Sequence, residues 1–294
     1  MTESAAPLDF SQAQQQYVAF LRDGGKANAT VLAYSKDIEQ LAEYALEQGK
    51  TQPSLVGYED IMQFQELLKK RRYTDKSISR KINSIKSFFK YLEDKGEVDH
   101  SPAHEVSHPR LDLQPPRYLS KMEYRALRDS CRHDVRIFAV VELLLQTGMR
   151  ISELASLAMD DIDLERGVIT IKPQLSRDGR KVPLNKPARQ ALVDYLKIRP
   201  KAREKTVFLT KTCRPFLVRN IRSAIDGCFK LAGIKGATLN DLRNTFIVEQ
   251  LRAGTPLVYV SQLVGHKRIT TTEKYLELIG EKQEMMPQVA IEEL

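Results

Sequence analysis

The chain has 294 residues, of which 42% are hydrophobic and 29% charged, and its formal net charge is +8. This length favours two domains, and the composition suits hydrophobic cores. No apolar run approaches the roughly 20 residues that cross a bilayer, and residues 1–10 do not have the pattern of a secretion signal, so we expect a cytoplasmic protein with no membrane partner. The 3 cysteines and 5 histidines show no metal-ligand spacing, which predicts buried structural thiols and no metal site.

The first hundred residues predict a bundle of helices. Apolar residues recur at helical spacing over 10–21, 29–48, 58–70 and 75–95, with glycine turns between the first segments. The last of these helices has the clearest apolar stripe, at alternating steps of four and three residues: Ile78, Ile82, Ile85, Phe89 and Leu92.

The opposite face of that last helix is rich in cations. Between Lys69 and Lys90 there are nine Lys or Arg against one acid, Asp75. Long cationic and amide side chains can reach phosphates and base edges, and a small serine lets a helix lie deep in a groove. An ordinary solvated face remains the alternative, but such faces usually also carry acidic residues. The pattern therefore favours DNA contact by five residues: Lys76, Arg80, Asn83, Ser87 and Lys90.

The segment 101–117 is rich in proline and has no sustained periodicity, which is typical of a linker. It separates a helical domain at 8–100 from a second domain at 118–284, which is followed by a tail at 285–294. The second domain is expected to be mainly helical with a small antiparallel sheet, so the fold class is mainly α (α+β). Its predicted strands are 167–172 and 181–184, and its predicted helices include 135–145, 186–196, 218–231, 239–253, 256–264 and 270–276.

Four segments of the second domain carry residues suited to phosphate chemistry. Arg150 begins a helix directly after a buried one, and Arg243 interrupts an amphipathic helix. His266 follows a glycine, and Tyr275 comes nine residues later. Each alone has an ordinary structural explanation, and the chain contains no P-loop, zincin or α/β-hydrolase motif.

In this order and spacing the four segments resemble the tyrosine recombinase (phage integrase) family, most closely its short Xer-like members. The resemblance covers nearly the whole chain and implies an N-terminal core-binding (SAM-like) domain followed by a catalytic domain. It further implies a site-specific recombinase that cleaves and rejoins a double-stranded DNA target site through a 3′-phosphotyrosyl intermediate, without a cofactor. Two alternatives stay open: a DNA-binding relic with weak or no strand exchange, and a type IB topoisomerase-like relaxing enzyme.

The resemblance also implies a role for each of the four residues. Tyr275 is the nucleophile, Arg150 and Arg243 hold the non-bridging phosphate oxygens, and His266 contacts phosphate or handles a proton. Guanidiniums suit the first task because they bind oxyanions in bidentate fashion and stay charged at any working pH. Tyrosine needs nearby positive charge or a base, because its unperturbed pKa is about 10.

Three positions depart from the family pattern. Asn240 stands where the family has a histidine three residues before the second arginine, and Asn244 stands where a histidine often follows it. The family's hairpin lysine is replaced by Leu175. Lys172 is included among the expected catalytic residues as its substitute, with Arg177 and Lys181 as the other candidates.

The resemblance implies four protomers on two DNA sites, possibly with a related recombinase, and passage through a Holliday junction. The tail is apolar for so polar a terminus, which favours docking on a neighbouring protomer or packing on its own chain. Its apolar residues are Met285, Met286, Val289, Ile291 and Leu294.

Overall fold

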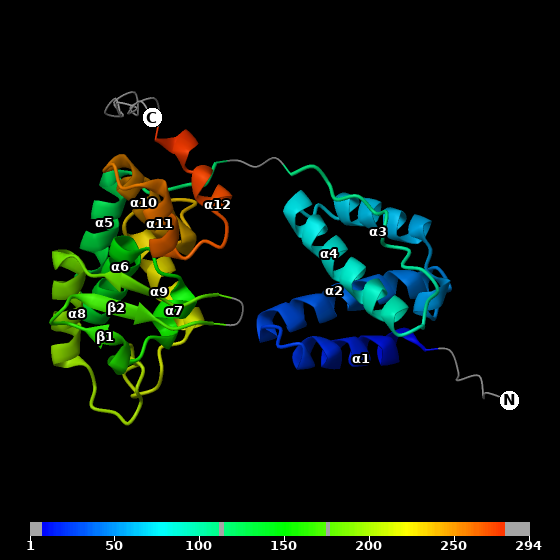
Figure 1. Cartoon of the computed structure of the whole chain (residues 1–294), viewed down its shortest axis with the longest axis horizontal. Coiled ribbons are helices and arrows are strands. Elements are labelled where there is room, and N and C mark those ends of the chain that lie inside the picture. Colours follow the sequence, from blue (N-terminus) through cyan, green and yellow to red (C-terminus); the bar gives the residue numbers. More distant parts are fainter. Residues whose placement is uncertain (1–7, 112–114, 175–176, 280–294) are drawn as a thin grey trace, which may run out of the picture. The chain divides into compact units, whose positions relative to one another are not determined.

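The computed structural model describes residues 8–111, 115–174 and 177–279, so the predicted tail at 285–294 lies outside the described residues. The chain divides into two compact units, Met1–Leu113 and Gln114–Leu294 (Figure 1). This division falls within the segment 101–117. Among the helices of the described ranges, none is both long enough and apolar enough to cross a membrane.

The first unit is a bundle of helices. Its apolar stripe on the last helix is buried, since all five predicted residues are at most 2% exposed. That helix begins at Asp75, and the hydroxyl of the preceding Thr74 accepts a hydrogen bond from the Ser77 amide and so caps the first turn. The elements are α1 (Phe10–Asp23), α2 (Asn28–Glu47), the 3-10 turn η1 (Pro53–Leu55), α3 (Tyr58–Lys70) and α4 (Asp75–Asp94).

A buried carboxylate joins α2 to α4. Asp37 is 1% exposed and accepts hydrogen bonds from Arg80, from Lys81 Nζ at 2.8 Å and from Ser84 Oγ at 2.6 Å. Lys81 is itself buried and also donates to Gln40. The cationic helix is thus held in place by an ion-pair network, in which Arg80, predicted to bind DNA, also has a structural contact.

Replacing Asp37 by alanine is expected to destabilise the first unit by about 3–5 kcal/mol, because it leaves the buried Lys81 ammonium without its counter-charge. The control is Glu39→Ala on the same helix, which removes only an exposed pair with Lys36 and should cost under about 1 kcal/mol. Urea unfolding of the full chain, followed by circular dichroism, measures both. Equal shifts for the two variants would contradict the structural role of Asp37.

The second unit confirms the prediction of a mainly helical domain with a small antiparallel sheet. Its strands β1 (Ile162–Asp163), β2 (Val168–Ile171) and β3 (Arg180–Pro183) lie in the order β1-β2-β3. In the register of β2 with β3, Val168 faces Pro183 and Ile171 faces Arg180. The helices are α5 (Lys121–Cys131), α6 (Val135–Thr147), α7 (Ile151–Ser156), α8 (Lys186–Ile198), α9 (Val218–Leu231), α10 (Leu239–Arg252), α11 (Leu257–Val264) and α12 (Thr270–Glu273), with 3-10 turns η2 (Met159–Asp161) and η3 (Leu276–Leu278).

The helix expected over 270–276 is shorter than predicted. It ends at Glu273, and Tyr275 precedes the 3-10 turn η3. Three consecutive threonines begin this segment, and β-branched residues lose side-chain freedom in a helix, so the local sequence does not sustain a longer one.

The buried helix α6 ends in a glycine that lets α10 approach closely. Gly148 has φ +61°, the left-handed conformation that ends many helices. A Cβ atom there would lie 2.3 Å from Cδ1 of Phe246 on α10. The absence of a side chain therefore brings the residues after α6 next to α10, where Arg243 is located.

Candidate active site

A cleft of about 530 Å³ in the second unit gathers four of the six predicted catalytic residues, namely Arg150, Asn240, Arg243 and His266. They come from the start of α7, from α10 and from the loop after α11. Elements distant in the sequence thus converge on one space, and most of the polar groups there are cationic or neutral. The cleft is also lined by Leu144, Met149, Ile151, Ser152, Arg177, Leu239, Asn244 and Thr271.

Arg150 is held by a carboxylate and by the loop that carries His266. Its guanidinium donates to Glu153 Oε1 at 2.9 Å and to the Gly265 carbonyl at 2.7 Å. Glu153 is buried and also accepts two hydrogen bonds from Arg180, at 3.0 and 2.7 Å. Burial alone would raise the pKa of Glu153, but the hydrogen bonds from Arg180 and Arg150 outweigh it and lower that pKa to about 2. The carboxylate therefore stays ionised and fixes both guanidiniums.

Arg243 is held by backbone carbonyls. It donates to the Gly148 carbonyl, and to the Val264 carbonyl at 2.7 Å. Burial, followed by the positive charge of Arg150, lowers the pKa of Arg243 to about 9, so the group is still charged at pH 7. A guanidinium has five N–H donors, and these two contacts leave others for an oxyanion.

His266 is a neutral imidazole in this setting. Burial and then the charges of Arg243 and Arg150 lower its pKa to about 4. Its Nδ1 lies 2.8 Å from Thr272 Oγ1, which fixes the ring. A neutral ring can accept a proton, and an anion bound between the arginines would offset the charges that lower this pKa.

Acidification is expected to lower the free energy of unfolding in two steps. The pKa of His266 is about 4 in the folded chain against an ordinary 6.5, so its contribution is present above pH 6.5 and is lost as pH falls towards 4. The pKa of Glu153 is about 2 against 4.5, so its contribution is lost between pH 4.5 and 2. Each pKa unit corresponds to about 1.4 kcal/mol, so either step is at most about 3.5 kcal/mol.

Urea midpoints measured from pH 7.5 down to pH 4.5 test the first step, and His266→Asn should remove it. A midpoint that falls equally in the variant over this range would contradict the assignment to His266.

Tyr275 lies beside the cleft, in a small apolar cluster. It is 8% exposed, and its ring stacks on His266 with centroids 6.4 Å apart. Its hydroxyl donates to Asn244 Oδ1 at 2.8 Å. Burial raises the pKa of Tyr275, the charge of Arg243 opposes this, and Asp241 raises it further. In the protein without DNA, Tyr275 is therefore a protonated phenol.

Lys172, like Tyr275, is not among the residues that line this cleft. Its ammonium pairs with Asp161 at 2.7 Å, and its side chain is 63% exposed. Arg177, another of the three candidates from the hairpin, does line the cleft. Leu175, at the family's lysine position, lies outside the described residues.

Two residues of the site make contacts that the sequence alone did not predict, Glu153 with Arg150 and Asn244 with Tyr275. Glu153 follows Arg150 by three residues, a capping-box spacing that could have indicated their contact. Asn244 was noted only as a departure from the family pattern, and no local signal indicates its hydrogen bond to Tyr275.

The five residues of α4 predicted to bind DNA share one side of that helix. Lys76, Arg80, Asn83 and Lys90 are exposed, and Ser87 is partly exposed. Lys90 lies 3.8 Å from Asp94, and Arg80 contacts Asp37.

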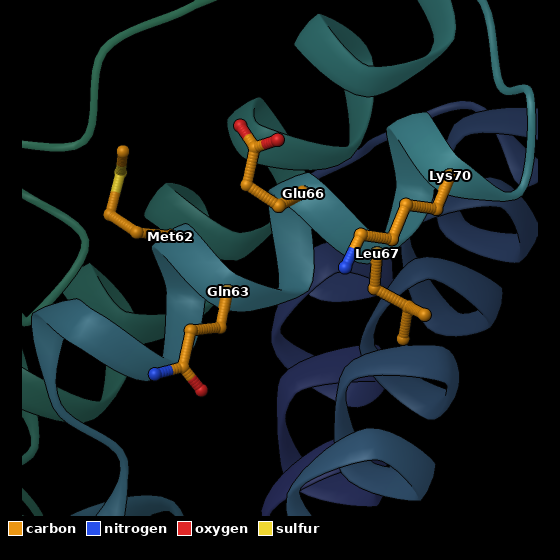
Figure 2. Close-up of a pocket in the computed structure, with 5 residues that line it drawn as sticks. All are labelled: Met62, Gln63, Glu66, Leu67 and Lys70. Atoms are coloured by element: carbon orange, nitrogen blue, oxygen red, sulfur yellow. The ribbon is translucent and has the colours of Figure 1, made fainter.

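A separate hollow of the first unit lies on α3 and has a different character. Figure 2 shows its side chains along that helix, with one carboxylate, one ammonium and no arginine among them. This hollow lacks the paired guanidiniums of the cleft. It is lined by Met62, Gln63, Glu66, Leu67 and Lys70.

Two guanidiniums and a neutral histidine line the cleft beside a tyrosine, an arrangement that suits the binding of a phosphate group. Family comparison agrees: the phage integrase family model matches residues 117–281, and the phage integrase N-terminal SAM-like domain matches residues 15–96. This chain belongs to the phage integrase family, as the resemblance predicted, and it is a site-specific tyrosine recombinase.

Its relatives include recombinases of the Xer type. The chain is 30% identical to tyrosine recombinase XerC of Roseiflexus sp. (strain RS-1), over 90% of this chain and 89% of that protein. It is 31% identical to tyrosine recombinase XerD of Listeria monocytogenes serotype 4b (strain F2365), over 85% and 88% respectively. A lambda integrase tetramer bound to a Holliday junction shares its fold, with a TM-score of 0.75 at 14% identity over 92% of this chain and 80% of that chain.

Proposed function

We propose that this recombinase cleaves DNA by attack of Tyr275 on a phosphodiester held by Arg150 and Arg243. His266 would contact the phosphate or accept and donate a proton. The single observation that supports this most strongly is the convergence of both guanidiniums and the imidazole on one cleft, beside the tyrosine. In the reaction the tyrosine oxygen forms a bond to phosphorus and the bond to the 5′ oxygen breaks. The tyrosine loses its proton, the departing oxygen gains one, and a 3′-phosphotyrosyl ester remains for religation.

The two arginines would act mainly by stabilising the negative charge that develops on the phosphate. Attack builds negative charge on the non-bridging oxygens, and donors already fixed in place stabilise it without reorganising. Glu153 and the carbonyls of Gly148 and Val264 supply that fixation for the two groups. Asn240 lines the same cleft and would donate its amide N–H to a phosphate oxygen, although it cannot exchange a proton near pH 7.

For the departing 5′ oxygen, the cleft lining favours Arg177 over Lys172 as the hairpin cation. A guanidinium stays protonated at any working pH, so Arg177 would stabilise charge on that oxygen without protonating it. The proton would then come from water, or from His266 after its neutral ring has accepted the proton of Tyr275.

We further propose that the protein works in the cytoplasm as a tetramer on double-stranded DNA, with a related recombinase as a possible partner. The lambda integrase tetramer on a Holliday junction supports the assembly, and likeness to both XerC and XerD proteins supports the second partner.

A suicide-substrate assay tests the covalent step. Duplexes that the protein retains from a random-sequence pool identify its site, and a nick near the scissile bond then traps the intermediate. We expect a covalent adduct whose digested peptide carries the nucleotide on Tyr275. A bound site that yields no adduct would support the DNA-binding relic. Relaxation of a supercoiled plasmid lacking the selected site would support the topoisomerase-like alternative.

The predicted DNA contacts of α4 are tested by salt dependence. Replacing Lys76 and Lys90 together by alanine is expected to weaken binding uniformly across sequences and to reduce the log–log salt slope by about 2, because each phosphate contact releases about 0.9 counterion. The matched control is Lys36→Ala on α2, whose exposed ammonium already pairs with Glu39. Fluorescence anisotropy from 50 to 200 mM salt measures both, and an unchanged slope in the double variant would contradict the contacts.

A further inference from the structure

The hydroxyl of Tyr275 is engaged by an asparagine in the protein without DNA. Asn244 lines the cleft, whereas Tyr275 is not among its lining residues. The hydroxyl instead donates to Asn244 Oδ1 at 2.8 Å, across 31 positions of sequence. The nucleophile and the phosphate-binding groups are therefore neighbours, but the reacting oxygen has another partner.

The orientation of the Asn244 amide follows from its second contact. Its Nδ2 donates to the Arg117 carbonyl at 2.7 Å, and a backbone carbonyl can only accept. This contact places Oδ1, which also can only accept, against Tyr275. The tyrosine must then be the donor, and a phenolate at that position would face the amide oxygen without a hydrogen bond. The arrangement stabilises the protonated form of Tyr275 and disfavours the reactive one.

The Arg117 carbonyl is itself firmly held. The guanidinium of Arg117 pairs with Glu123 at 2.7 Å and with Asp241 at 3.2 Å, and the following residues bond to α10 through the Leu119 amide and Thr245 Oγ1 at 2.8 Å. Asn244 therefore cannot turn its amide over without losing a bond to a fixed acceptor.

We propose that Asn244, fixed by the Arg117 carbonyl, is a positioning residue that holds Tyr275 protonated and away from the phosphate until DNA is bound. This inference rests on Tyr275 as the nucleophile. It goes beyond that assignment because it gives Asn244, which is not one of the proposed phosphate-binding groups, the role of restraining the nucleophile before DNA binds. Strand cleavage requires the Tyr275–Asn244 hydrogen bond to break, and the hydroxyl to lose its proton as its oxygen bonds to phosphorus.

Two substitutions at the same position have opposite expected effects. Asn244→Ala removes the acceptor, so it should lower the pKa of Tyr275 and raise the single-turnover cleavage rate at pH 7 about 2- to 10-fold, the range that one hydrogen bond spans. Asn244→Asp keeps an acceptor and adds negative charge, so it should raise that pKa and slow cleavage. A purely structural role would slow cleavage in both variants and would not move the pKa in opposite directions.

The pKa of Tyr275 is measured without DNA by ultraviolet titration. The titration curve of each variant is corrected by subtracting the curve of the same variant that also carries Tyr275→Phe. This difference isolates one tyrosine among 11. Opposite shifts in the two variants support the restraint even if no adduct forms on any DNA, so this test is distinct from that of the covalent step. An unchanged pKa in Asn244→Ala, or cleavage slowed in that variant while it remains folded by circular dichroism, would overturn the proposal. Asn244→Leu, which keeps the branched shape of asparagine without its polar atoms, should behave as the alanine variant does, and if it does not the proposal fails.

Discussion

Replacing Tyr275 by phenylalanine is expected to abolish the covalent protein–DNA adduct and to leave DNA binding within about twofold. The substitution removes only the oxygen that is proposed to attack the phosphate, and phenylalanine has no group that can form an ester in its place. The ring keeps its packing in the apolar cluster with Phe246, Leu263 and Val264. The one hydrogen bond lost, to Asn244, contributes about 1 kcal/mol, so the variant should fold.

The matched control for this prediction is Tyr259→Phe in the same unit. Tyr259 lies on α11 and is 49% exposed, so its hydroxyl should be dispensable for adduct formation. Gel separation of trapped complexes on a nicked site measures both variants, and anisotropy measures their binding. An adduct that persists in Tyr275→Phe would assign the nucleophile to another residue.

The helices could be predicted from the sequence because their signal is local. The apolar residues of α4 recur about once per helical turn, and this spacing alone predicts that its isoleucines are buried. Order and spacing that resemble a family likewise predicted a grouping of residues: Arg150, Arg243 and His266 line one cleft, and Tyr275 stacks on His266.

The contacts that hold those residues could not be predicted, because each joins distant segments. Asp37 meets Lys81 across 44 positions, and Glu153 meets Arg180 across 27. Such polar pairs produce no periodic pattern in the sequence, because each pair needs only one residue from each segment and does not constrain the neighbouring residues. The same holds for Lys172, whose place at the end of a strand gave no sign that Asp161 would pair with it.

Replacing Arg243 by alanine is expected to slow single-turnover cleavage at saturating DNA by roughly a thousandfold. Removal of one fixed donor from an oxyanion site typically costs about 3–4 kcal/mol of barrier, and Arg243 brings a full charge as well. The variant also removes the donor of the Gly148 carbonyl and one of two donors to the Val264 carbonyl, which still accepts from Arg150 at 3.3 Å, so it should cost about 1–3 kcal/mol of stability, measured by urea unfolding followed by circular dichroism.

The conservative variant separates charge from geometry. Arg243→Lys keeps the positive charge, but a single ammonium cannot reproduce the planar arrangement that bonds two carbonyls and an oxyanion together, so we expect it to recover at most about tenfold of the lost rate. The control Arg219→Ala removes an equal charge from an exposed site on α9 and should leave the saturated rate unchanged.

The Arg243 variants are compared at saturating DNA because the cleavage rate then no longer depends on DNA affinity. A group that binds substrate and transition state equally changes affinity, whereas one that binds the transition state more strongly changes the rate of the bound complex. If Arg243→Ala weakened DNA binding and left the saturated rate intact, its guanidinium would serve only to hold the DNA. The proposed stabilisation of the developing charge would then have to come from Arg150, the other guanidinium held against Glu153 and the Gly265 carbonyl.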